Sequence, residues 1–259
     1  MTNIVFCLLV LVAASQALPN NLKSTNRNRH DAEAFEFPFQ ISLQDKQTYF
    51  HFCGGTVINK KFALTAAHCV NDKKASDVLI IAGVLNKQSF VYSREIYQFI
   101  VHEEFNRDGQ WGNDIAIIEL DTYFEITPRI GDVRLPSKND TFELKDTYVL
   151  SGWGTIRGHP QINDMLQRTE LVLTEQGYCR QMYDELKINV SDTNICALDP
   201  ESAKAACYGD DGGPLTRNGT LVGVLLFAVG CIETKYPILF TSVLPYLDWI
   251  KNNTYCNIC

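Results

Sequence analysis

Three stretches of the chain carry residues able to perform acid–base or nucleophilic chemistry. T-A-A-H-C places His68 directly before a cysteine, and G-N-D-I-A-I-I places Asp114 at the start of an expected strand. In the third stretch, C-Y-G-D-D-G-G-P-L, the adjacent carboxylates Asp210 and Asp211 stand in a glycine-rich turn. A histidine with carboxylates suits proton transfer, and the same groups suit a metal ion. Each stretch alone is weak, because a lone histidine is most often structural.

Short strands must position these residues, because β-branched and aromatic runs recur between turn residues while helical periodicity is scarce. The runs are F-P-F-Q-I-S-L, G-G-T-V-I, D-V-L-I-I-A-G-V-L, Q-F-I-V-H, D-I-A-I-I-E-L, T-Y-V-L-S-G-W-G, T-E-L-V-L-T, T-L-V-G-V-L-L-F-A-V and P-I-L-F-T-S-V. This spacing predicts an antiparallel sandwich or barrel. Asn218-Gly219 predicts a tight hairpin turn, and L-P-Y-L-D-W-I-K-N-N predicts a helix near the C-terminus. The turn-rich stretch 127–140 is expected to link two β halves.

The first residues read as a secretory leader. An apolar run that is too short to span a membrane ends in small residues, which predicts a signal peptide over 1–17. No later run is long and apolar enough to cross a bilayer. We therefore expect a secreted, extracellular protein with no membrane partner. The net charge of −7 argues against nucleic-acid binding, which favours a basic patch.

The cysteine count agrees with an oxidising compartment. Removal of the leader removes Cys7 and leaves eight cysteines, an even number that indicates disulfides in a secreted chain. The terminal C-N-I-C can also begin a metal or redox motif, but one isolated C-x-x-C is weak support for that. Four N-x-[ST] sites suit glycosylation on a secretory route, at Asn139, Asn189, Asn218 and Asn252.

Taken together, the motifs resemble one family. T-A-A-H-C, N-D-I-A, S-G-W-G-T and C-x-G-D-x-G-G-P-L, in this order and spacing, resemble the trypsin/chymotrypsin family of serine proteases (peptidase S1) over 26–255. The resemblance implies an all-β fold of two six-stranded antiparallel barrels with a C-terminal helix. The barrels would span about 26–130 and 131–255, with the active cleft between them. Residues 18–25 would form a loose segment and 256–259 a cysteine-containing tail.

The resemblance also implies a role for each candidate residue. His68 matches the general base, Asp114 the carboxylate that orients it, and Asp211 stands where the family has its serine nucleophile. The backbone N–H groups of Gly209 and Asp211 would form the oxyanion hole. Asp210 matches the residue that pairs with the freed N-terminus in active members.

Asp211 is a poor replacement for serine. A carboxylate has no proton for His68 to remove, and it is a weak nucleophile toward an amide. Its negative charge also opposes an oxyanion at the place where electrostatic stabilisation matters most. We expect instead an ion pair between Asp211 and a protonated His68, which would raise the pKa of that histidine.

Three further departures from the family pattern concern activation, specificity and the support of Asp114. The aligned activation tetrapeptide is N-R-N-R, and cleavage after Arg29 would leave the new N-terminus four residues short, about 13 Å of extended chain. Leu226 replaces a small polar residue that supports the orienting aspartate, and Phe227 replaces a tryptophan. The specificity-pocket positions are Ala205, Ala228 and Ile238. Branched Ile238 is expected to fill the pocket, and Ala205 offers no carboxylate to a basic side chain.

The family's disulfide pattern fits the remaining cysteines. The resemblance implies the pairs Cys53–Cys69, Cys179–Cys196 and Cys207–Cys231. Cys256 and Cys259 are then left to pair with each other or with another chain. Because 78–93 lacks the clustered carboxylates of the family's calcium loop, we expect no calcium there, and no cofactor or metal elsewhere.

The resulting interpretation is a secreted, catalytically inactive serine protease homologue that acts by binding other proteins. The pattern is most similar to arthropod trypsin-like proteins, and among them to the inactivated protease paralogues of parasitic (scabies) mites. By analogy, the partners would be host defence proteins such as complement components. The alternatives are a weakly active serine-type endopeptidase, a metal site built from His68, Asp114 and Asp211, and a secreted relic with no specific partner.

Overall fold

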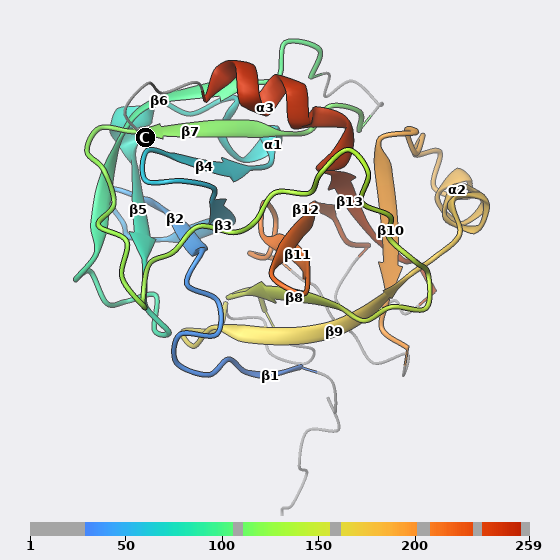
Figure 1. Ribbon diagram of the computed structural model, residues 1–259, viewed down its shortest axis with the longest axis horizontal. Coiled ribbons are helices and arrows are strands. Elements are labelled where there is room, and N and C mark those ends of the chain that lie inside the picture. Colours follow the sequence, from blue (N-terminus) through green and yellow to red (C-terminus); the bar gives the residue numbers. More distant parts are fainter. Residues whose placement is uncertain (1–28, 106–110, 156–161, 201–207, 230–234, 255–259) are drawn as a thin grey trace, which may run out of the picture.

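The computed structural model describes residues 29–105, 111–155, 162–200, 208–229 and 235–254 (Figure 1). The first closed antiparallel barrel has the strand order β2 (Gln40–Asp45), β3 (His51–Val57), β4 (Phe62–Thr65), β7 (Ala116–Leu120), β6 (Ser93–Val101) and β5 (Val78–Ala82). The pairing of β2 with β5 closes it.

The second barrel is also six-stranded. Its strands are β8 (Tyr148–Gly152), β9 (Gln167–Leu173), β10 (Asn194–Leu198), β13 (Ile238–Ser242), β12 (Thr220–Phe227) and β11 (Pro214–Arg217). The pairings of β11 and β9 with β8 complete the ring. The predicted pair of six-stranded antiparallel barrels is confirmed.

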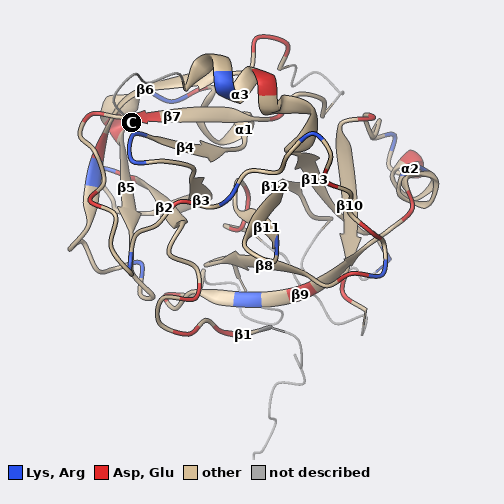
Figure 2. Ribbon diagram, in the orientation of Figure 1, with Lys and Arg blue, Asp and Glu red and all other residues tan. Residues whose placement is uncertain are grey.

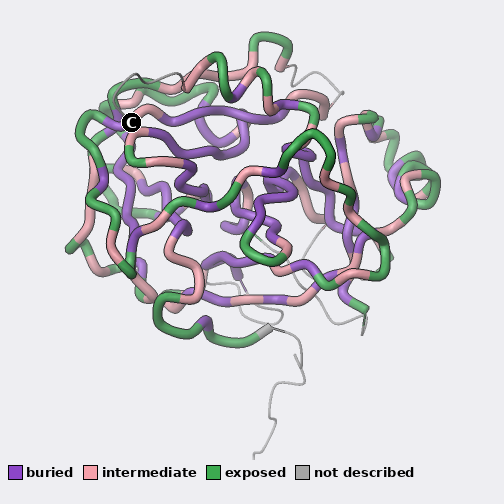
Figure 3. The backbone as a smooth tube through the Cα atoms, in the orientation of Figure 1, coloured by how far each residue is buried: buried purple, intermediate pink, exposed green. Residues whose placement is uncertain are grey.

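Burial explains why these segments form strands. Side chains along β9 alternate between buried and partly exposed, the period-2 pattern of a strand with one buried face, whereas all five residues of β5 are buried. In Figure 3 the buried backbone follows the strands and the exposed backbone follows the loops. Figure 2 shows most charged residues on connecting segments and strand ends, away from the two cores.

Helices are few and short. The described chain has α1 (Ala67–Val70), α2 (Gln176–Asp184) and α3 (Leu247–Asn253), with 3₁₀ turns η1 (Ala75–Asp77) and η2 (Leu244–Tyr246). The expected C-terminal helix is confirmed as α3. The sequence patterns did not predict α2, because only Cys179 and Tyr183 of its nine residues are buried and no full apolar face repeats.

Two connections behave as the sequence predicts. Asn218 and Gly219 join β11 to β12 with φ of 49° and 74°, the positive values that a two-residue hairpin requires. The stretch 127–140 runs between the barrels, and Arg134 there forms a bridge with Thr220 at the start of β12.

Both ends of the described chain pack on the barrel that is distant in sequence. β1 (Arg29–Asp31) pairs with β9 of the second barrel. Ile250 of α3 is buried in the core of the first barrel, beside which Figure 1 draws the helix. No helix of the described residues has the length and hydropathy needed to cross a membrane. β1 and α3 therefore each join one barrel to the other.

Candidate active site

His68 and Asp114 form a close pair at the junction of the barrels. α1 follows β4 and carries His68, while Asp114 lies just before β7, the neighbour of β4. The Asp114 carboxylate accepts from His68 Nδ1 at 2.7 Å through Oδ2 and from the His68 backbone N–H at 2.9 Å through Oδ1. Asp114 is fully buried. This geometry fixes the ring through Nδ1, and Nε2 lies 3.7 Å from Cys69 Sγ.

A side chain of the second barrel holds the main chain of Asp114. The Thr241 hydroxyl of β13 donates to the Asp114 carbonyl at 2.9 Å. Leu226, at the position where the resemblance implies a polar support, lies in an apolar cluster with Cys179, Tyr183 and Leu239. The hydrogen bond from Thr241 therefore goes to the main-chain carbonyl of Asp114, while Leu226 makes apolar contacts.

Asp211 lies in the glycine-rich turn before β11, and its carbonyl accepts from the Gly54 N–H of the first barrel at 2.7 Å. Burial raises the pKa of Asp211 to about 6; the charge on His68 lowers that pKa, while Asp210 and Asp114 raise it. The position thus holds a partly buried carboxylate electrostatically coupled to His68. A negative charge here opposes the formation of a second one, as acyl transfer requires.

Asp210 points into a space bounded by glycines. It is buried, and Oδ1 accepts from the Gly154 N–H at 2.8 Å. A Cβ added at Gly152 or Gly154 would overlap the Asp210 carboxylate. The glycines of S-G-W-G therefore have a packing role, since any side chain would displace this carboxylate.

His51 is a residue of the site that sequence reasoning missed. Its ring is buried, with Nδ1 2.8 Å from Ser42 Oγ and Nε2 2.7 Å from the Gly209 carbonyl oxygen. Burial is the main cause that lowers the pKa of His51 to about 4, so the ring is neutral at pH 7. The carbonyl of Gly209, the residue whose N–H is expected in the oxyanion hole, is thus held by a neutral histidine. The only sequence signal is a histidine two residues before Cys53, and a lone histidine indicates no specific role.

Aromatic side chains lie beside His68, and two of the specificity-pocket positions pack in the second barrel's core. Trp111 stacks on Phe227 with ring centroids 5.4 Å apart, and its ring lies nearly perpendicular to that of His68, with centroids 6.5 Å apart. Ile238 is buried in the second barrel's core, and Ala228 packs against the same cluster. Ala205 lies outside the described residues.

The three chemical residues do not gather as metal ligands. Within the described chain, the group whose ligand atoms all lie within 4.8 Å of one another is Cys53, His68 and Cys69. Both cysteines belong to a disulfide, and both carboxylate oxygens of Asp114 already accept from His68. The alternative of a metal held by His68, Asp114 and Asp211 therefore has no support in this geometry.

Two of the implied disulfides are present in the described chain. Cys53–Cys69 joins β3 to α1, and Cys179–Cys196 joins α2 to β10. The first bridge fixes the helix that carries His68. The pair Cys207–Cys231, the cysteines Cys256 and Cys259, and the signal peptide lie outside the described residues.

The chain is similar in sequence to known proteins. The Trypsin family model matches residues 27–250. The chain is 36% identical to Chymotrypsin-2 of Vespa crabro, covering 86% of this chain and 97% of the relative. It is 33% identical to Trypsin-1 of Astacus astacus, with 86% and 97% covered. It is 30% identical to Trypsin Blo t 3 of Blomia tropicalis, with 96% of both covered.

A solved structure gives the same result. Neuropsin, a serine protease expressed in mouse brain, superposes with a TM-score of 0.78 at 25% identity, covering 88% of this chain and 99% of that chain. The sequence match, the two closed barrels and the His68–Asp114 pair agree. The chain therefore belongs to the trypsin family.

Proposed function

We propose that this chain is a secreted, catalytically inactive member of the trypsin family that acts by binding another protein. The observation that carries the proposal is Asp211, a carboxylate coupled to His68 at the position of the family's nucleophile. An ionised carboxylate needs no general base and attacks an amide weakly. Loss of the serine alone lowers kcat about a millionfold in a well-studied protease.

The surroundings of the pair support the same conclusion. By the family resemblance Ile238 stands at a specificity-pocket position, and its side chain is buried; Trp111, stacked on Phe227, lies beside His68. On the proposed reading, these bulky groups hinder a substrate from bringing its carbonyl into place. A misplacement of about 1 Å can lower the rate a hundredfold.

Secretion rests on the apolar leader and on the disulfides. Both described bridges suit an oxidising compartment, and the asparagines of all four N-x-[ST] sites are exposed. The partner class, host defence or complement proteins, rests on the resemblance to parasitic mite paralogues. Affinity capture from host plasma with the purified mature chain tests it, with a fold-matched active trypsin, blocked at its serine, as control.

A weakly active serine-type endopeptidase is the second candidate, because the hydrogen bond between His68 and Asp114 is complete. Labelling with a fluorophosphonate and turnover of a mixed peptide library separate the two candidates. The inactive chain gives no covalent adduct and no turnover beside an active trypsin. An adduct would locate a nucleophile and favour the endopeptidase.

A further inference from the structure

A polar hollow lies on the second barrel, between the hairpin of β11 and β12 and the stretch 134–142 that approaches it. Its volume is about 300 Å³, the lower end of the range of small-ligand sites. Arg217 and Asn218 line it from the hairpin, and Asn139 and Phe142 line it from the opposite side. Figure 1 draws the stretch, in green, passing β12. We call this cavity the hairpin hollow.

Two N-x-[ST] sites meet at the hairpin hollow. N-D-T begins at Asn139, and N-G-T begins at Asn218. The two asparagines are far apart in the sequence, yet both are exposed and both line this one cavity. A sugar attached to either side-chain amide therefore starts at the edge of the hollow. The sequence alone displays the two sites but not that folding brings them together.

Hydrogen bonds hold the two walls of the hairpin hollow together. The Arg134 N–H donates to the Gly219 carbonyl at 3.2 Å, and the Arg134 carbonyl accepts from the Leu221 N–H at 2.8 Å. A third bond runs from Arg217 Nη1 to the Thr141 carbonyl at 3.1 Å. The cavity is therefore formed before any ligand arrives, and a ligand that fits loses less free energy to ordering of the protein.

The lining of the hollow is polar, and its charges are balanced. Of the eight residues that line it, seven are polar or charged and the eighth is Phe142. Arg217 Nη2 lies 2.6 Å from Asp146 Oδ2, and Arg134 Nη1 lies 3.9 Å from Asp140 Oδ2. Because each guanidinium has a carboxylate beside it, the hollow has little net attraction for an anion. Mixed donors and acceptors around one aromatic ring suit a neutral sugar, whose hydroxyl groups both donate and accept and whose C–H face is apolar.

Arg134 offers donors that a sugar in the hollow can reach. Its side chain is 64% exposed, and the 3.9 Å to Asp140 is longer than a hydrogen bond. The Asp140 carboxylate accepts instead from the Ser137 N–H at 3.0 Å and from the Ser137 hydroxyl at 2.9 Å. Since a guanidinium has five N–H groups, a sugar hydroxyl or acetamide carbonyl can accept from Arg134.

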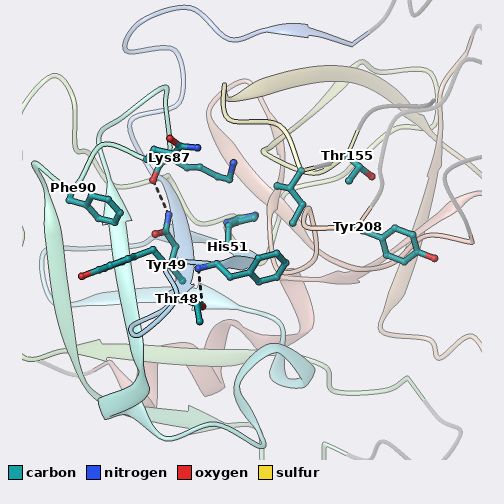
Figure 4. A pocket seen from close by; sticks show the side chains of 11 residues that line it. Thr48, Tyr49, His51, Lys87, Phe90, Thr155 and Tyr208 are labelled. Atoms are coloured by element: carbon teal, nitrogen blue, oxygen red, sulfur yellow. Dashed lines mark hydrogen bonds between the residues drawn. The ribbon is translucent and has the colours of Figure 1, made fainter. Parts of the chain in front are cut away.

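The larger groove between loops of the two barrels has a different lining (Figure 4). Its volume is about 960 Å³, and it is bordered by four exposed rings, those of Tyr49, Phe50, Phe90 and Tyr208. Among its described lining residues there is no asparagine of an N-x-[ST] site, and none of them also lines the hairpin hollow. An attached sugar is therefore expected in the hollow and not in the groove.

We propose that Asn218 carries an N-linked glycan whose first N-acetylglucosamine lies in the hairpin hollow. Asn218 Nδ2 forms a bond to C1 of that sugar, the bond from C1 to the oxygen of a lipid pyrophosphate donor breaks, and the amide proton passes to a base of the cell's glycosyltransferase. Gly219 places no side chain beside Asn218, whereas Asp140 places a carboxylate beside Asn139 that repels the pyrophosphate. The seated sugar joins the hairpin to 134–142 and stabilises the fold. The inference rests on the secretory route proposed above.

Secretion of the full chain from mammalian cells restricted to high-mannose glycans tests the attachment. Endoglycosidase H leaves one N-acetylglucosamine on each used asparagine, and peptide mass spectrometry locates it. We expect it on Asn218; its absence there, or a sugar on Asn139 instead, overturns the inference. The chain is expressed in parallel with a foreign leader. Protein in the medium from the foreign leader alone contradicts the proposed secretion, and the sugar is still read on that protein.

Thermal melts test whether the sugar is seated in the hollow. Thr220→Val removes the N-G-T site without changing Asn218, and it removes a buried hydroxyl that has no hydrogen-bond partner in the described chain. The substitution by itself should therefore be neutral or stabilising. Treated in the same way, the variant should nevertheless melt about 2–4 °C below the wild-type protein trimmed to one sugar. An equal or higher melting temperature overturns the seated sugar.

Two further variants test where the sugar lies. Arg134→Ala should lower the melting temperature of the one-sugar protein by about 1–2 °C, and by less than half as much when combined with Thr220→Val. Asn252→Gln removes the exposed site on α3, outside the hollow, and is the matched control with no expected loss. Equal effects of Arg134→Ala in both backgrounds, or an equal loss in Asn252→Gln, overturn the contact in the hollow.

Discussion

A carboxylate beside His68 has consequences for both chemistry and stability. Asp211 is partly buried, and burial raises its pKa to about 6 despite the lowering effect of the charge on His68. The His68–Asp114 hydrogen bond is nevertheless intact at 2.7 Å. At the scale of residues, the chain therefore keeps a well-oriented histidine but presents it with a carboxyl group that is mostly ionised at pH 7.

Asp211→Ser should not create a working protease. The substitution restores a hydroxyl near His68, but Ile238 remains buried in the second barrel's core and the activation sequence remains N-R-N-R. The substrate carbonyl would not be held in attack geometry, and these defects act as one unit. The variant is assayed on a mixed peptide library beside the unmodified protein and an active trypsin. Turnover within a hundredfold of that trypsin would make Asp211 the single lesion.

Asp211→Asn should stabilise the fold at neutral pH. The folded-state pKa of Asp211, about 6, lies above its ordinary value of 3.8, so the folded state binds the proton more tightly than the unfolded state. The Asp211 contribution is then favourable below about pH 4 and is lost as the pH rises through about 6. The asparagine variant should gain on the order of 1–3 kcal/mol at pH 7 and little at pH 4.

Urea unfolding at the two pH values measures this difference. Asp132→Asn is the control, because that carboxylate is exposed and far from the turn in sequence. A gain that is the same at pH 4 and pH 7 would contradict the assignment to titration of Asp211.

At the scale of elements, glycines decide which segments can approach. In the S-G-W-G segment that ends β8, Gly154 leaves room for the Asp210 carboxylate, which accepts its N–H at 2.8 Å. At the start of α2, a Cβ added to Gly177 would meet no atom of the described chain within 4 Å. Gly154 is therefore needed for close packing, whereas the space beside Gly177 can accept a side chain.

Alanine at these two positions should have opposite effects. Gly177→Ala adds a methyl group to open space inside α2 and should stabilise the protein by about 0.5–1 kcal/mol. Gly154→Ala must displace Asp210 and should destabilise by several times as much, roughly 2–4 kcal/mol. Denaturant unfolding of both variants checks the pair. Equal and small effects would mean that Asp210 can move without loss.

At the scale of the whole molecule, a disulfide lies within each barrel, and two terminal segments join one barrel to the other. Cys53–Cys69 and Cys179–Cys196 each tie a helix to a strand, and β1 and α3 each pack on the barrel distant in sequence. The site lies where the barrels face each other, so its geometry depends on both cores.

The mature chain should begin near Leu18 and contain no free thiol. Cleavage of the expected leader would remove Cys7 and leave eight cysteines, an even number. N-terminal sequencing and thiol titration under denaturing, non-reducing conditions check this. Two reactive thiols assigned to Cys256 and Cys259 would contradict the tail disulfide while leaving the other bridges intact.

Local pattern predicted most of the strands. The nine apolar runs fall on strands of the barrels, the Asn218-Gly219 turn has the expected positive φ values, and the apolar spacing near the C-terminus gives α3. These features depend on neighbours within a few residues, which a sequence displays directly. α2 was missed because Cys179 and Tyr183 alone bury their side chains, and the bridge to Cys196 holds the helix in place.

The sequence by itself determined the order of the motifs, the candidate pair His68 and Asp114, and the aspartate at 211, where the family resemblance implies a serine. Only the tertiary structure decided that His51 holds the carbonyl of Gly209, a residue 158 positions away, and that aromatic side chains of both barrels meet around one groove. The physical reason is the separation along the sequence of the residues that interact. Strand and turn signals come from near neighbours, whereas burial, a shifted pKa and a cavity arise from residues that only folding brings together.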